Sequence, residues 1–125
     1  MGDRVSVTSQ SVYGSWSVAL DLDARVVTVH AGRELVLRER VSAAELREVR
    51  ALAAPLLAHG DRRERTQFTS GEETFEVQLG GRAVTWSFID ESGGGAYEAR
   101  PLWEWATRRL HAAKSDSEPE SGSKS

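Results

Sequence analysis

The sequence contains no cysteine, and this absence removes several kinds of chemistry at once. Disulfides, thiolate nucleophiles and sulfur-based metal sites are all excluded. Small secreted domains usually rely on disulfides, so a chain of this size without them is expected in a reducing compartment, and we predict a cytoplasmic protein. The first residues lack the apolar stretch of a secretory signal. No apolar run approaches the roughly 20 residues of a membrane span, so no membrane partner is expected.

The chain also lacks an excess of positive charge. Its 125 residues carry 16 basic and 19 acidic side chains, which gives a net charge of −3. A nucleic-acid-binding surface needs a basic patch, so nucleic acid is not an expected partner. Arginine outnumbers lysine by 14 to 2, a usage that is typical of GC-rich bacterial genomes.

The length predicts one domain with one modest hydrophobic core. We assign residues 1–113 to a single compact α+β domain. Residues 114–125 are rich in serine and acidic side chains and have no large apolar residue. Such a segment cannot bury enough surface to offset its ordering entropy, so we predict a disordered tail.

Apolar residues at every second position predict a sheet of five or six strands. A short strand begins the chain, and residues 16–22 and 25–30 form a hairpin in which Leu20 faces Val27. Residues 34–40 follow as a strand whose many charges suit the edge of a sheet. Gly80 and Gly81 then form the turn of a second hairpin, with residues 74–79 on one side and a strand ending at Phe88 on the other.

Two helices complete the predicted fold. Ser42 and Glu45 have the spacing of a capping box, and the apolar residues that follow have helical spacing. Pro55 is expected to kink or end this helix, and Gly60 to stop it. The last helix starts at Pro101 and ends near Ala113. The order predicts a two-layer sandwich, with an antiparallel sheet and both helices on one face.

No group of residues in the sequence has the pattern of a catalytic, metal or cofactor site. The three histidines fit strand and helix ends better than a general base. Asp21 and Asp23 flank a predicted turn, where acidic residues are common. Residues 93–95 are glycines that lack the lysine and hydroxyl of a phosphate-binding loop, so they are interpreted as a linker. We therefore predict a protein that is not an enzyme and binds neither a metal nor a cofactor.

The aromatic residues are more informative. Trp16, Trp86 and Trp103 occupy predicted core-facing positions. Trp105 lies about 200° around the helix from Trp103, so it is either a covered edge residue or an exposed anchor for a partner. Arg108 and Arg109 follow at spacings that would let them stack on it. Tyr13 and Phe68 are two further candidates for contact with a partner, and each lies in a predicted polar loop.

The order of these elements resembles that of emfourin-type inhibitors of thermolysin-like metalloproteases. The matching segments are residues 11–15 as the aromatic loop, 41–46 as the first helix start, 75–88 as the hairpin and 101–110 as the last helix. The resemblance implies inhibitory contacts at Tyr13 and Gly14. The paired glycines and phenylalanine of the family's loop are absent, and the strand at 34–40 is extra.

These observations favour a non-catalytic protein-binding module of a bacterium. It could act as an inhibitor, as an immunity-type neutraliser or as an accessory subunit of a complex, and it would be a monomer or a weak homodimer. A different class, a small-molecule-binding domain or minor enzyme, would use a pocket between sheet and helices. Arg25 and Arg82 would then serve as anion anchors. A deep pocket lined by arginine and histidine would favour this second class.

Overall fold

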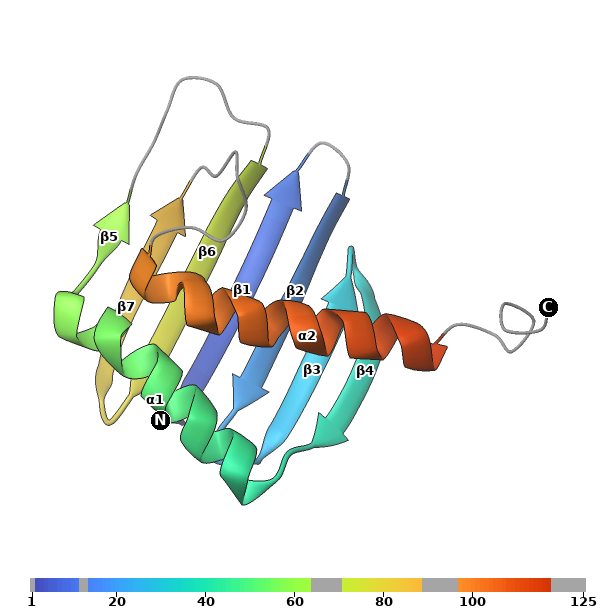
Figure 1. The fold of residues 1–125 in the computed structure, drawn as a ribbon, viewed down its shortest axis with the longest axis horizontal. Helices are drawn as coiled ribbons and strands as arrows, with labels where there is room; N and C mark the ends of the chain where they lie inside the picture. The colour runs from blue at the N-terminus through green and yellow to red at the C-terminus, as the bar shows by residue number, and fades with distance from the viewer. Residues whose placement is uncertain (1, 12–13, 64–70, 89–96, 118–125) are drawn as a thin grey trace.

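The computed structural model describes residues 2–11, 14–63, 71–88 and 97–117, and it confirms the predicted α+β class (Figure 1). The strands are β1 (Arg4–Ser11), β2 (Gly14–Asp21), β3 (Val26–Ala31), β4 (Glu34–Arg40), β5 (Arg62–Arg63), β6 (Gly71–Leu79) and β7 (Arg82–Phe88). The helices are α1 (Ala43–His59) and α2 (Arg100–Ser117), and the short 3-10 helix η1 (Tyr97–Ala99) leads into α2.

The strand order is β4-β3-β2-β1-β6-β7-β5. Six strands pair antiparallel, and the two-residue β5, which the sequence did not predict, runs parallel to β7 at one edge. The first strand, β1, lies between the two predicted hairpins and pairs with β2 and β6. The predicted edge position of β4 is confirmed. A bulge opposite Val29 and His30 adds to its charges in making it a poor template for further pairing.

Both predicted hairpin registers are confirmed. Leu20 pairs with Val27 across β2 and β3, and the turn that joins these strands covers residues 22–25, which is longer than a two-residue turn. Val77 pairs with Val84 across β6 and β7. Gly80 and Gly81 have φ angles of 58° and 81°, the left-handed conformation that a tight hairpin turn requires.

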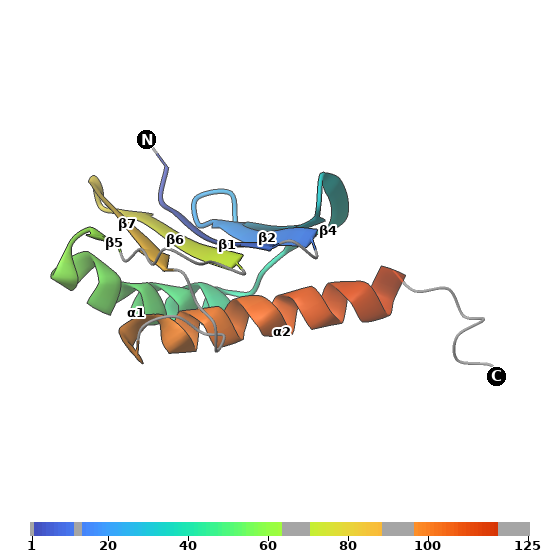
Figure 2. The same ribbon diagram turned by 90° about the horizontal axis from the view of Figure 1, so that it is seen from above.

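The two helices lie on one face of the sheet, and no described element lies on the other (Figure 2). We call this uncovered surface the open face. Alternation along each strand sends one set of side chains towards the helices, where the core forms. The fully buried large side chains are Trp86, Trp105, Phe75, Leu20, Leu56, Leu102, Val5, Val7, Val18, Val27, Val29 and Val49.

The ends of α1 follow the predicted caps in part. The Ser42 Oγ accepts a hydrogen bond from the Glu45 amide at 3.1 Å, which is one half of the capping box. The helix continues through Pro55 and stops at Gly60, whose amide donates to the Leu56 carbonyl at 3.1 Å and whose φ is 85°. Of the two alternatives predicted for Pro55, a kink or an end of the helix, the second is therefore wrong.

The final helix is longer than predicted. It runs to Ser117, four residues past the expected end at Ala113. Residues 118–125, the rest of the predicted tail, lie outside the described residues, as do the glycines at 93–95. Within the described ranges, no helix is long and apolar enough to cross a membrane.

Candidate functional site

The strand ends beside two predicted contact residues meet at one end of the sheet. Tyr13 and Phe68 themselves lie outside the described residues. Ser11, the last residue of β1, is in register with Gly14 at the start of β2 and with Gly71 at the start of β6. Ser11, which borders positions 12–13, and Gly71, which follows positions 64–70, are therefore on neighbouring strands, although about 60 positions separate them in the sequence (Figure 1). Arg63, which precedes positions 64–70, lies on β5 at the edge of the sheet.

Gly14 is the described member of this predicted site. It is exposed, its φ is 138°, and a Cβ added to it would meet no atom within 4 Å. The backbone conformation, and not crowding, is therefore what favours glycine here. The Ser11 Oγ donates to the Gly14 carbonyl at 3.2 Å, which closes the connection between β1 and β2.

Trp105 is not the exposed anchor that one sequence interpretation offered. Its side chain is 1% exposed, and its indole N–H donates to Glu45 Oε2 at 2.9 Å. The helical period correctly placed it far around α2 from Trp103, which packs against Trp16 at 5.2 Å between ring centroids. Both tryptophans are covered because α2 contacts the sheet on one side and α1 on another. Trp105 therefore belongs to the interior and is withdrawn as a binding residue.

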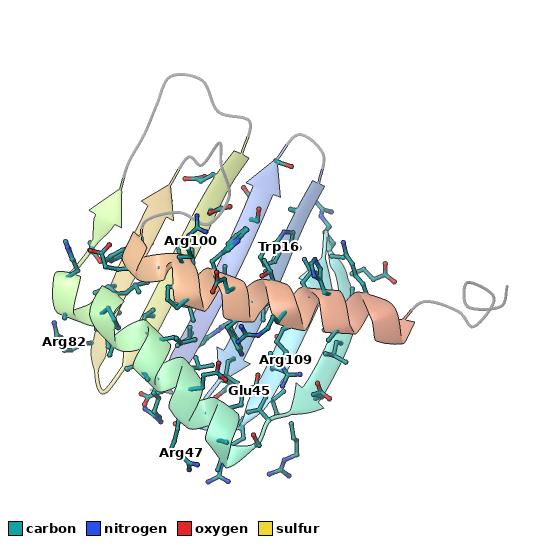
Figure 3. All side chains as sticks on the ribbon, viewed as in Figure 1. Trp16, Glu45, Arg47, Arg82, Arg100 and Arg109 are labelled. Carbon is teal, nitrogen blue, oxygen red and sulfur yellow. The ribbon has the colours of Figure 1, made fainter. Side chains whose placement is uncertain are left out.

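Arg109 is also withdrawn as a binding residue, because its guanidinium is bonded inside the protein. Its guanidinium binds the Glu45 carboxylate through two nitrogens, with Nε to Oε2 at 2.8 Å, and a third nitrogen reaches Glu39 on β4. In Figure 3, Glu45 and Arg109 lie between the two helices. Arg108 differs because its side chain is 62% exposed and pairs with the exposed Glu48 at 3.1 Å. Among the described residues, neither arginine stacks on Trp105, and of the two only Arg108 stays a predicted partner contact.

Glu45 is the residue that the sequence analysis underestimated. Burial raises the pKa of its carboxyl, but the hydrogen bonds from Arg109 and Trp105 outweigh burial and hold the pKa below its ordinary value. The same ion pair with Glu45 raises the pKa of Arg109 against the opposing effect of burial. A sequence signal did exist, because Trp105 and Arg109 are four residues apart and share one side of α2.

Other polar groups have structural roles. The Asp21 carboxylate accepts from the amides of Asp23 and Ala24 at 3.1 and 3.0 Å, as expected for an acidic residue at a turn. The His59 ring packs edge-on against Trp86 at 5.3 Å. In the part of the chain that the structure describes, no group of three or more histidines and carboxylates is placed to hold a metal ion.

Two shallow hollows lie on the open face, on either side of Arg4. One of about 260 Å³ is lined by Arg4, Ser6 and Glu76 with their neighbours on β6 and β7. The other, of about 240 Å³, is lined by residues of β1 to β4 that include Asp21 and Arg38. Both lie on the side of the sheet away from the helices, so neither is the pocket between the two layers that a small-molecule site was expected to use.

The two arginines predicted as anion anchors, Arg82 and Arg25, do not lie in a pocket between the sheet and the helices. Arg82 donates from Nη2 to the Leu57 carbonyl at 3.2 Å, and it therefore joins the second hairpin to α1. Arg25 is exposed in the turn after β2, with a φ of 60°. Among the described residues, these two arginines do not converge on either hollow.

Comparisons with known proteins add no identification. A scan of the sequence against protein-family models returns no match. A search of curated proteins also returns none.

Proposed function

We propose that this chain is a non-catalytic protein-binding module, and that the end of the sheet around Ser11, Gly14 and Gly71 carries its partner contact. One observation carries the proposal. The register of β1 pairs Ser11 with Gly14 on β2 and with Gly71 on β6, so one border of each aromatic-bearing polar segment lies at the same end of neighbouring strands. Loops held at one end of a rigid sheet are a common way to build a protein-recognition surface.

The rest of the described structure supports a scaffold role for the sheet and helices. The space between them is filled by core side chains with little or no exposure, such as Val5, Val7, Leu102 and Ala106. The polar network between α1 and α2 is internally paired. A rigid support of this kind lowers the entropy cost of presenting a loop to a partner.

The specific form of the proposal is an inhibitor of a thermolysin-like metalloprotease. Its support is the resemblance in element order, together with the position of the exposed residues Ser11 and Gly14 at one end of two central strands. In this form Tyr13 and Gly14 are the proposed inhibitory contacts, and Phe68 is a further proposed contact. The immunity-type and accessory-subunit alternatives use the same surface on a different partner.

The test is an inhibition assay. The purified chain is titrated against a thermolysin-type metalloprotease that cleaves a fluorogenic peptide, and inhibition at stoichiometric amounts is the expected result. Tyr13→Ala should weaken the inhibition, and Gly14→Ala should weaken it through the change in φ. Arg47→Ala, at an exposed position of α1, is the matched control and should inhibit like the unmodified chain.

Two outcomes would count against the proposal at different levels. Full protease activity at a large excess of the chain would reject the inhibitor form. Capture experiments with Tyr13→Ala, Phe68→Ala and the control would then test the broader class. If the chain binds a partner equally well with every one of these changes, the assignment of the site to this end of the sheet is wrong.

A further inference from the structure

The open face of the sheet carries a regular arrangement of charge. The pairing registers place Arg38, Thr28, Ala19, Ser6 and Glu76 in one row across β4, β3, β2, β1 and β6. The middle of this row carries only small side chains, which line the two shallow hollows of the open face. Arg38 and Glu76 are exposed on either side of it.

The neighbouring positions repeat this polarity. Arg40 adds a second exposed cation on β4, and Glu72 adds a second exposed carboxylate on β6. On this face β4 therefore contributes cations and β6 contributes carboxylates, with β2 midway between them. Arg4 on β1 and Asp21 on β2 add one exposed charge of each sign near the middle. A surface with this layout is complementary to a copy of itself, because a two-fold axis along β2 exchanges β4 and β6 between the two copies.

We propose that the open face binds a second copy of this chain in a weak symmetric dimer. With the axis along β2, Arg38 of each copy lies over Glu76 of the other, which makes two equivalent ion pairs. Ala19 meets its own counterpart on the axis, and Thr28 lies over Ser6. These small side chains let the two sheets approach in the aligned packing that face-to-face sheets adopt.

Further features of the face fit the same arrangement. Leu35 is a large apolar side chain that is 51% exposed, and its pairing with His30 places it on this face at β4, where the second copy would cover it. Arg4 of the second copy would lie over Val26, which lines the hollow of about 240 Å³ together with Asp21. That hollow provides room for the arginine, and its lining carries the Asp21 carboxylate as well as the Arg38 guanidinium.

The size of the face indicates a reversible dimer. Five overlapping strands, spaced about 4.8 Å apart with about six residues each, cover roughly 500 Å² per copy. The total of roughly 1,000 Å² is at the lower limit for a specific interface. We therefore expect association that depends on protein concentration and weakens with salt, since exposed ion pairs are screened.

The first test is sedimentation velocity on the full chain, from about 1 µM to about 1 mM protein. The expected result is a shift from monomer to dimer, with a weaker dimer at about 500 mM salt than at about 50 mM. A monomer at every concentration would overturn the proposal. If Ala19→Arg then abolished binding of another protein, the open face would be assigned to that protein instead.

The decisive test exchanges charges between copies. Arg38→Glu and Glu76→Arg should each weaken the dimer by about tenfold or more, because both symmetric ion pairs become repulsive. An equimolar mixture of the two variants should associate again, because each contact in the mixed dimer then joins opposite charges. This rescue also shows that both variants are folded.

The control is Arg47→Glu, which makes the same charge change on α1, in the helical layer (Figure 3). It should leave the dimer affinity unchanged. A dimer that persists in Arg38→Glu and Glu76→Arg, or a mixture that stays monomeric, would overturn the proposed face. This test is independent of the partner contact at Ser11 and Gly14, since none of its variants lies there.

Discussion

The contact between the two helices gives the sharpest stability prediction, and the perturbation is Glu45→Ala. The Glu45 carboxylate accepts from the indole of Trp105 and from two nitrogens of Arg109. Its side chain is 19% exposed and that of Arg109 is 17% exposed, so both groups are largely removed from solvent. Removal of the carboxylate therefore leaves partners that water cannot fully replace.

The magnitude follows from these contacts. An indole N–H that is buried without an acceptor costs about 1–3 kcal/mol. The lost charge-assisted bonds from Arg109 add about 1 kcal/mol, a low value because Arg109 keeps its ion pair with Glu39. We expect the free energy of unfolding to fall by about 2–4 kcal/mol and the melting temperature to fall by about 10 °C.

The matched control is Glu48→Ala. Glu48 also joins α1 to α2, through Arg108, but these side chains are 46% and 62% exposed. Exposed ion pairs contribute little, so the control should lose at most about 0.5 kcal/mol. Urea unfolding followed by tryptophan fluorescence measures both variants, because Trp105 reports on the helix contact.

A double-mutant cycle separates the indole bond from the ion pair. Trp105→Phe removes the donor, so its cost and that of Glu45→Ala should not add, and a coupling of about 1 kcal/mol is expected. The reasoning would be refuted if Glu45→Ala cost no more than Glu48→Ala. It would also be refuted if the effects of Glu45→Ala and Trp105→Phe were fully additive.

Two further stability predictions follow from the same structure. Because the folded-state pKa of Glu45 lies below its ordinary value of 4.5, the stabilisation is complete above that value and is lost as pH falls through the folded-state pKa. The stability advantage of the unmodified chain over Glu45→Gln, measured by urea unfolding, should therefore shrink between about pH 5 and about pH 3, roughly the window in which a carboxyl titrates. An advantage that stays constant with pH would contradict this assignment. At the second hairpin, Gly80 has a φ of 58° and no atom within 4 Å of an added Cβ, so Gly80→Ala should cost about 1 kcal/mol through backbone strain alone, and Gly80→Asn should cost less. Equal costs for Ala and Asn in thermal unfolding would show that strain is not the cause.

Local patterns account for most of the fold. The hairpin registers, the start of α1 and the edge position of β4 were predicted from alternation, turn residues and a cap. These features depend on residues close together in sequence. The position of β1 between the two hairpins was not predicted, because the pairing of β1 with β6 joins residues about 70 positions apart and no local signal specifies it.

The candidate site was less predictable than the fold. The sequence placed Gly14 in a loop, whereas Gly14 is the first residue of β2. The sequence also gave no reason to place Ser11 beside Gly71. The registers of Ser11 with Gly14 and with Gly71 decided that arrangement. The open face is a similar case, since Arg38 and Glu76 are far apart in the sequence and share a row only once five strands are ordered.

Trp105 shows where sequence reasoning stops. The helical period by itself determined that Trp103 and Trp105 point in different directions, and this remains correct. Whether the second direction meets solvent or protein depends on where α1 lies, and α1 is placed by the packing of both helices on one sheet face. The tertiary structure therefore decided that Trp105 is buried and bonded to Glu45, because the neighbour that covers it is about 60 positions away in the chain.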